Sequence, residues 1–274
     1  MSTKKRILFI AHEMSPYLEL TDYAAMVNKL AVKANESGME VRVIMPRFGL
    51  INERRHRLHE VVRLSGINVI IDNDDFPLLI KVASLPNARL QVYFMDNEDY
   101  FKRKFTFHDE DGQWYEDNAT RMIFFCKSAL ETVKKFGWPP DVIHCSGWMT
   151  SLIPLYLKTA YKKEPVFADS KVIYTLEEDQ FSEKMEDTFI KKAAISNQIK
   201  PKDLEPYKAG THAALNAGAC KYADAVALAT GHVNKKLVEE LKKQKGKIVL
   251  PFQQDNEDVA DYLQLYGQLA STNS

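Results

Sequence analysis

The chain has 274 residues, of which 45% are hydrophobic and 27% are charged, a composition typical of a soluble globular protein with one or two domains. Its 37 Lys and Arg residues balance 37 Asp and Glu residues, so no broad positive field exists to attract nucleic acid or an anionic membrane. No apolar run approaches the ~20 residues of a membrane span, and three widely separated cysteines predict no disulfide framework. We therefore expect a cytoplasmic protein that binds neither nucleic acid nor membrane.

The amino-terminal part of the chain predicts a β-α-β unit. Residues 5–11 form a buried-strand pattern, apolar residues then recur at helical spacing until Gly38, and residues 39–46 supply a second strand. Such a unit is the building block of a parallel sheet. The helix is expected to face the core through the stripe Tyr23, Met26, Val27 and Leu30.

The middle of the chain has a different pattern. Residues 58–96 contain short strand-like runs separated by turn residues, which is typical of antiparallel hairpins, and we interpret them as a hairpin insertion or a local extension of the sheet. A polar segment, 97–117, follows, after which the alternation of strands and helices resumes up to a terminal helix at 255–270. The expected fold is α/β, a single doubly wound Rossmann-like domain over residues 1–274 with its ligand edge at the carboxyl ends of the strands.

Five segments occur in an order and spacing that resemble a known enzyme family. They read ILFIAHEMSPYLE, GMEVRVIMPRFGLI, PPDVIHCSGWMTSLIPLYLK, KVIYTL and LNAGACKYADAVALATGHV. Together they resemble the amino-terminal half of bacterial glycogen synthase and plant starch synthase, the ADP-glucose-dependent glucosyltransferases of family 5. The resemblance implies one half of a GT-B fold, in which two Rossmann-like domains hold the glucan and the nucleotide sugar respectively. The chain ends about where the second domain would begin, so we expect one catalytic half to be missing.

The turn after the first strand departs from the family pattern. The family carries Lys-Thr-Gly-Gly-Leu there, in which the lysine neutralises phosphate and the glycines let backbone amides approach it. Here Glu19 stands at the lysine position, and Thr21 and Asp22 stand at the two glycines. With charges ~5 Å apart and an effective dielectric near 20, ~3 kcal/mol of attraction becomes repulsion of similar size. We expect the turn to reject nucleotide and Thr21 or Asp22 to cap the helix.

Two further sites have lost the family's ligand-contacting side chains. The family's His-Asp-Trp-His reads Ser-Gly-Trp-Met, so Gly147 and Met149 replace the aspartate and the second histidine, and only Trp148 remains. After the next strand, Glu177 and Glu178 replace the family's His-Asn. With three sites rewritten while the framework persists, we predict no catalytic residue, no metal and no cofactor.

Four side chains remain candidates for contact with a sugar. Glu13 and Tyr17 are expected near the mouth of the cleft as partners for hydroxyl groups. Trp148 would either stack on a sugar ring or pack in the core. Glu177 opens an acidic run, Glu177 to Asp179, which is either a solvated loop or a site for a hard cation.

Other residues are expected to serve packing. His144 ends a buried strand and is interpreted as a bonded core histidine, with Cys145 beside it an inert thiol. Glycosyltransferases of the two-domain type commonly end with a helix that crosses back onto the first domain. The stripe that includes Val259 and Tyr262 therefore leads us to expect that the helix at 255–270 packs back in this way.

Three functions follow from these features. The first is a non-catalytic family member with a glucan-binding or regulatory role in glycogen metabolism, whose ligand is an α-glucan or oligosaccharide. The alternative is an active glucosyltransferase completed by a partner chain that carries the nucleotide-binding domain, because an exposed cleft face invites a protein partner or a second copy. The third, an enzyme that uses carboxylates near Glu177 as acid and base, needs two carboxyl groups with separated pKa values.

Overall fold

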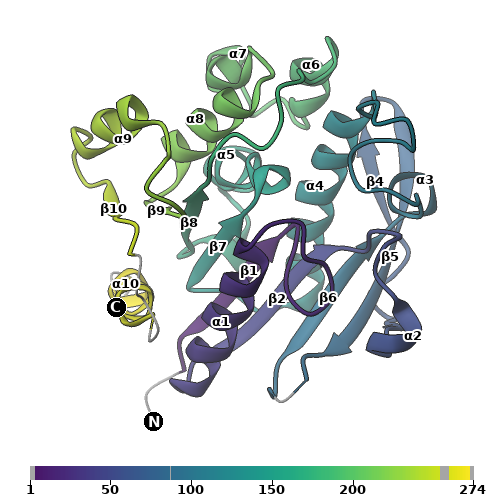
Figure 1. Cartoon of the computed structure of the whole chain (residues 1–274), viewed down its shortest axis with the longest axis horizontal. Coiled ribbons are helices and arrows are strands. Elements are labelled where there is room, and N and C mark those ends of the chain that lie inside the picture. Colours follow the sequence, from purple (N-terminus) through teal and green to yellow (C-terminus); the bar gives the residue numbers. More distant parts are fainter. Residues whose placement is uncertain (1–3, 87, 254–258, 272–274) are drawn as a thin grey trace.

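The computed structural model describes residues 4–86, 88–253 and 259–271. Its strands and helices follow one another as the sequence predicts for an α/β domain (Figure 1). The strands are β1 (Arg6–Ala11), β2 (Glu40–Pro46), β3 (His59–Glu60), β4 (Ile67–Ile71), β5 (Asp74–Ser84), β6 (Gln91–Asp96), β7 (Val142–Ser146), β8 (Lys171–Leu176), β9 (Ala225–Leu228) and β10 (Ile248–Leu250).

The helices connect these strands across both faces of the sheet. They are α1 (Tyr23–Glu36), α2 (Glu53–His56), α3 (Glu98–Phe101), α4 (Asn118–Phe136), α5 (Ile153–Lys158), α6 (Phe189–Ala193), α7 (Pro201–Leu204), α8 (His212–Tyr222), α9 (Lys235–Lys242) and α10 (Ala260–Ser271), with 3-10 turns η1 (Trp148–Thr150), η2 (Pro165–Phe167) and η3 (Glu205–Tyr207). No helix in the described ranges combines the length and the apolar character that crossing a membrane requires.

The sheet has the order β10-β9-β8-β7-β1-β2-β6-β5-β3, and β4 pairs with β5. All neighbours from β10 to β6 run parallel. From β1 the chain builds outward through β2 in one direction and, later, through β7 to β10 in the other, which is the doubly wound arrangement. The predicted fold class is therefore confirmed, and its topological switch point lies between the carboxyl ends of β1 and β7.

Residues 58–96 contribute to both kinds of pairing. Strand β5 is antiparallel to β3, β4 and β6, so this stretch forms an antiparallel edge of the sheet. Strand β6, however, also pairs in parallel with β2. The stretch thus adds a hairpin edge and, in addition, one strand of the parallel core.

Helix α10 (yellow in Figure 1) packs against α1 and β7, and Val259, Tyr262 and Tyr266 are buried there. The predicted start of this helix at 255 lies outside the described residues. Tyr266 Oη contacts His144 Nδ1 at 2.8 Å, and His144 Nε2 contacts Thr175 Oγ1 at 2.9 Å. Because both ring nitrogens are bonded, His144 is the satisfied core histidine that the sequence predicts.

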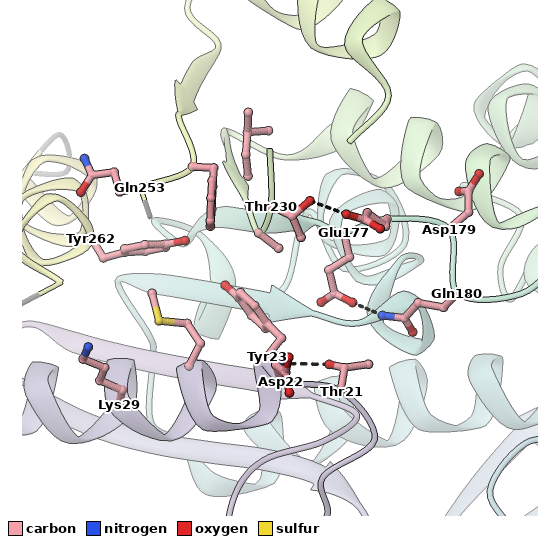
Figure 2. Close-up of a pocket in the computed structure, with 15 residues that line it drawn as sticks. Thr21, Asp22, Tyr23, Lys29, Glu177, Asp179, Gln180, Thr230, Gln253 and Tyr262 are labelled. Atoms are coloured by element: carbon pink, nitrogen blue, oxygen red, sulfur yellow. Dashed lines mark hydrogen bonds between the residues drawn. The ribbon is translucent and has the colours of Figure 1, made fainter. Parts of the chain in front are cut away.

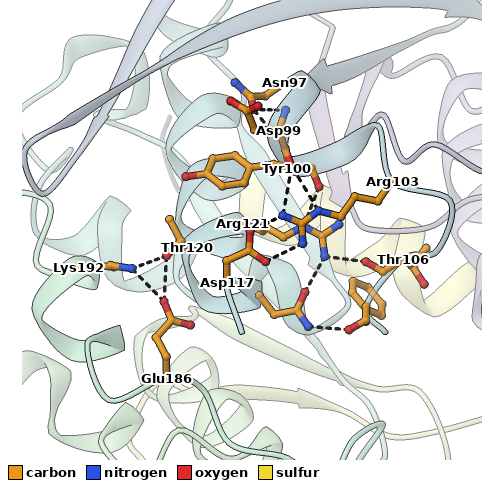
Figure 3. A network of polar contacts seen from close by, with 12 residues as sticks. Asn97, Asp99, Tyr100, Arg103, Thr106, Asp117, Thr120, Arg121, Glu186 and Lys192 are labelled. Carbon is orange, nitrogen blue, oxygen red and sulfur yellow. Dashed lines mark hydrogen bonds and ion pairs between the residues drawn. The ribbon is translucent and has the colours of Figure 1, made fainter. Parts of the chain in front are cut away.

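A buried arginine fixes the polar segment 97–117 (Figure 3). The Arg121 guanidinium, on α4, donates to the carbonyl oxygens of Tyr100 and Thr106 at 2.8 and 2.6 Å. Backbone carbonyl groups in such an irregular segment have no hydrogen-bond partners in a β-sheet or helix. A guanidinium has five N–H groups that can donate to them. Arg121 therefore fixes the course of a segment whose Phe107 and Trp114 rings pack against Trp148.

The pKa of His144 predicts an acid-sensitive fold. Burial lowers this pKa from the usual 6.5 to about 3, so folded His144 stays neutral while the unfolded chain takes up a proton below pH 6.5. The free energy of unfolding should therefore fall as the pH falls through this range, by about 1.4 kcal/mol per pH unit for this group. Urea unfolding of the wild type and of His144→Gln between pH 6 and pH 5 measures the difference. Glutamine can bond both hydroxyl partners without titrating, so equal pH slopes in the two proteins would contradict the assignment.

Candidate functional site

A cavity of about 570 Å³ opens at the carboxyl edge of the sheet, between α1, the loop after β8, the ends of β9 and β10, and α10. In Figure 2, Tyr23 and Tyr262 enter it from one side, and Glu177 and Gln180 from the other. Its volume lies in the range of small-molecule sites. The acidic lining residues are Asp22, Glu177, Glu178 and Asp179, and the aromatic ones are Tyr23, Phe252 and Tyr262.

Glu177 is the most buried carboxylate of the cavity. Its Oε1 accepts hydrogen bonds from Gly147 N at 3.0 Å and Ser146 Oγ at 3.2 Å, and Gln180 Nε2 donates to its Oε2. Burial raises the pKa of Glu177, and the nearby His12 imidazole offsets part of that rise. This carboxyl group is therefore suited to exchange hydrogen bonds with neutral polar groups more than to bind a free cation.

Gly147 brings the chain unusually close to His12. Its φ of +85° is in the left-handed region, and a Cβ atom at this position would lie 2.5 Å from the His12 ring. His12 is itself only 1% exposed and packs against Trp148 and Phe107. No side chain fits at position 147 while His12 keeps this conformation, so the aspartate that the resembling family carries there is sterically excluded.

The turn between β1 and α1 is filled by Glu13. Its Oε2 accepts from Leu20 N at 2.6 Å and Thr21 N at 2.8 Å, and its Oε1 accepts from Thr21 Oγ1 at 2.5 Å. Although burial tends to raise the pKa of Glu13, His12 and the bonds from Thr21 outweigh it and hold this pKa below its ordinary value. The first turn thus carries an ionised internal carboxylate.

One of the two expected capping residues bonds the start of α1. Thr21 Oγ1 accepts from Tyr23 N at 3.2 Å, whereas Asp22 makes no capping hydrogen bond although it stands at the N-cap of α1. Of the two residues expected at the helix start, Thr21 therefore bonds a helix amide and Asp22 does not. Glu19 is exposed and accepts from Ser15 Oγ at 2.7 Å.

The family comparisons agree with this architecture. The model of the starch synthase catalytic domain matches residues 6–248. The chain belongs to this family. Glycogen synthase of Chlorobium limicola is 39% identical over 172 residues, which are 62% of this chain and 35% of that protein, and the enzyme of Chlorobium phaeobacteroides is 40% identical over the same length. The matched part thus spans about a third of these curated relatives.

The fold of this starch synthase domain is also found in a solved relative. The catalytic domain of starch synthase IV from Arabidopsis thaliana, bound to ADP and acarbose, superimposes with a TM-score of 0.72 over 93% of this chain and 53% of that one, at 19% sequence identity. The similarity shows that the two domains share a fold. The chain is therefore a glycogen and starch synthase-like domain in which particular side chains differ from the family pattern.

Of the four predicted sugar contacts, only Glu177 lines the cavity. Tyr17 is buried, its ring packs against Phe94 with centroids 5.1 Å apart, and burial raises its pKa to about 12. Trp148 is 2% exposed, and its ring is surrounded by His12, Phe107, Trp114 and Phe181. Glu13, Tyr17 and Trp148 are thus buried and do not line the cavity.

The remaining predicted residues occupy different positions. Met149 is fully buried, while Glu178 lines the cavity and accepts from Thr230 Oγ1 at 2.8 Å. Asp179 lies 2.9 Å from His212 Nδ1. Within the described part of the chain, no three His, Cys, Asp or Glu side chains gather in a metal-binding arrangement. Cys145 is buried and its thiol pKa is raised well above the usual range by burial, as expected of an inert cysteine.

Sequence reasoning missed the aromatic side of the cavity. Tyr23 and Met26 pack against the core, as the helical stripe predicts, but both also line the cavity, whereas Val27 and Leu30 are fully buried. The available signal for Tyr23 was its place directly after the first turn, at the ligand edge of the sheet. Phe252 gave no such signal, because it follows a short strand in a segment without periodicity.

The close contact between Gly147 and His12 predicts a strongly coupled pair. Gly147→Ala should lower the free energy of unfolding by about 2–4 kcal/mol, from left-handed backbone strain and from the clash with the ring. His12→Ala in the same chain should remove the clash and leave only the strain. Gly246→Ala is the matched control, because Gly246 has a φ of +81° and no atom within 4 Å of a Cβ, and it should cost about 1 kcal/mol. Additive losses in the Gly147 and His12 double-mutant cycle, measured by urea unfolding, would contradict the contact.

Proposed function

We propose that this chain is a non-catalytic glycogen synthase-like domain that binds an α-glucan or oligosaccharide and has a regulatory role in glycogen metabolism. The main support for the proposal is a contact in the first turn, where the Glu13 carboxylate accepts hydrogen bonds from the amides of Leu20 and Thr21. Two of the backbone donors nearest the start of α1 are thereby withdrawn from an incoming phosphate. The replacement of the family's His-Asn by Glu177 and Glu178 adds negative charge where a nucleotide sugar would have to approach.

The cavity chemistry supports a neutral polyhydroxylated ligand. Aromatic faces such as those of Phe252 and Tyr262 stack on the apolar faces of sugar rings, and carboxylate, amide and hydroxyl groups accept or donate to sugar hydroxyls. Asp22, Glu178 and Asp179 would repel a diphosphate in the same space. The acid and aromatic lining therefore favours an oligosaccharide over a nucleotide.

The relatives support the same ligand class. Curated relatives that match this chain are glycogen synthases, and the solved starch synthase domain is bound to ADP and acarbose. This chain retains the fold while several side chains of the family pattern are replaced. We therefore propose that the saccharide function is retained and the nucleotide function is lost.

A second candidate is an active glucosyltransferase completed by a partner chain. Its support is Phe252, which is 42% exposed at the cavity and could be covered by another protein or by a second copy. Incorporation of labelled glucose from ADP-glucose into glycogen, measured with the chain alone and with candidate partners, separates the two functions. Turnover with any partner would replace the non-catalytic proposal.

Binding of maltooligosaccharides tests the proposal directly. Isothermal titration calorimetry should give saturable heat with maltoheptaose and no heat with ADP-glucose at the same concentration. Phe252→Ala should weaken the oligosaccharide about tenfold, because a stacking contact contributes about 1–1.5 kcal/mol. Leu50→Ala is the control, since Leu50 is an exposed hydrophobic residue that does not line the cavity. A folded wild type that gives no heat at millimolar maltoheptaose would rule out the glucan-binding role.

A further inference from the structure

The amino edge of the sheet, opposite the cavity, carries a guanidinium group that lies on aromatic rings. Arg42 stands near the start of β2, and its Cζ atom lies 4.8 Å from the ring centroid of Phe136 and 4.6 Å from that of Trp138. Trp138 is 5% exposed, and its indole N–H donates to Glu40 Oε1 at 2.7 Å. The two rings therefore form a fixed base under the half-buried Arg42 side chain.

The N–H groups of the Arg42 side chain have no acceptor within the protein. An aromatic ring contacts the face of a guanidinium and leaves the N–H groups in its plane free to donate. Over residues 4–86, 88–253 and 259–271, the Arg42 side chain makes neither a hydrogen bond nor an ion pair. Arg6, its neighbour on β1, differs in this respect, because it forms an ion pair with Glu40 at 3.5 Å. Arg42 is thus a positioned donor that lacks a counter-charge.

Two further arginines lie around Arg42. Burial raises the pKa of Tyr93, and the positive charges of Arg42 and Arg63 offset part of that rise, so both charges act at the Tyr93 hydroxyl. Arg89 comes two residues before Gln91, which is the partner of Arg42 in the register of β2 and β6. Arg63 and Arg89 are exposed, and neither forms an ion pair with another described residue. This edge of the sheet therefore carries a local excess of positive charge.

We propose that this arginine surface, made of Arg42, Arg63, Arg89, Tyr93 and Trp138, docks an acidic segment of a protein partner. Each guanidinium can donate two parallel hydrogen bonds to one carboxylate. The three guanidinium groups come from three separate segments, so they suit several carboxylates along a peptide better than one compact phosphate. Arginine, tyrosine and tryptophan are also the residues that most often dominate the binding energy of protein interfaces.

The aromatic base favours this role for Arg42 in particular. A long side chain that must be immobilised on binding loses conformational entropy, which weakens the complex. Contact with Phe136 and Trp138 already restricts Arg42 before a partner arrives. The arginine surface also lies at the start of β2 and β6, whereas the cavity lies beyond the ends of β8 and β9. Docking there leaves the cavity accessible, so this interaction goes beyond the saccharide function and does not depend on it.

Binding of a glutamate peptide tests the proposal. Fluorescein-labelled hexaglutamate is titrated with the full chain at low ionic strength and followed by fluorescence anisotropy, with a Gly-Ser peptide of the same length as the uncharged control. Hexaglutamate should bind saturably and more weakly as salt is added. Arg42→Ala should weaken binding about tenfold, because a charge-assisted and bidentate contact is lost. Arg42→Lys should weaken it about threefold, since an ammonium keeps the charge but not the planar donor pair.

Two matched variants control for attraction to positive charge elsewhere. Arg54→Gln removes an exposed arginine of α2, beyond the carboxyl end of β2, and Lys243→Gln removes an exposed lysine next to the lysine-rich helix α9. Neither should change the affinity for hexaglutamate. A wild type that does not bind the peptide, or a control variant that loses as much affinity as Arg42→Ala, would overturn the proposal.

Inorganic phosphate separates the proposed partner from a phosphate ligand. Sodium phosphate should displace labelled hexaglutamate no better than sodium chloride at equal ionic strength, because a compact anion cannot contact all three arginines at once. Displacement at a phosphate concentration at which chloride has no effect would assign the surface to phosphate and refute docking of an acidic peptide.

A measurement on the wild type keeps the proposal testable if Arg42→Ala does not fold. In two-dimensional NMR spectra, hexaglutamate should shift the indole N–H signal of Trp138, whose ring supports Arg42. The signals of Trp114 and Trp148, which pack against each other in a different cluster, should stay in place. A shift of either of these without a shift of Trp138 would also contradict the proposal. No saccharide is used, so the outcome is separate from that of the glucan-binding proposal.

Discussion

The contact of the Glu13 carboxylate with the amides of Leu20 and Thr21 is the interaction on which the site depends. It joins the end of β1 to the start of α1 and so fixes where the first turn of that helix lies. Tyr23 follows immediately, and its ring lines the cavity. An internal carboxylate thus satisfies backbone amides at the turn that precedes the cavity-lining residue Tyr23.

The cavity is held together by a buried polar chain between distant segments. Tyr266 of α10 bonds His144 of β7, His144 bonds Thr175 of β8, and Thr175 Oγ1 lies 3.2 Å from the hydroxyl of Tyr23 in α1. Each group is desolvated, so breaking one link would leave a buried polar atom without a partner. The position of α10, which carries Tyr262 into the cavity, is therefore coupled to the position of α1.

The fold follows the family, whereas several side chains at the carboxyl edge of the sheet differ from the family pattern. The fold is that of a starch synthase domain, because buried apolar strands pack in the same way whichever ligand the domain binds. At the carboxyl edge, His12 fills the space that a side chain at Gly147 would need, and Glu177 bonds the Gly147 amide. His12, Gly147 and Glu177 therefore pack against one another without a clash, although Gly147 and Glu177 differ from the family pattern.

The sequence alone determined the fold class, the parallel strands and the buried roles of His144 and Cys145, because hydrophobic periodicity and strand-to-helix order are local signals. It also identified the acidic turn and the run that begins at Glu177. Only the tertiary structure decided that Glu13, and not Asp22, bonds the turn amides, and that Tyr262 lies next to Tyr23 at the cavity. Those contacts join residues whose distance in space depends on how the sheet and α10 pack, and no local pattern in the chain encodes that distance.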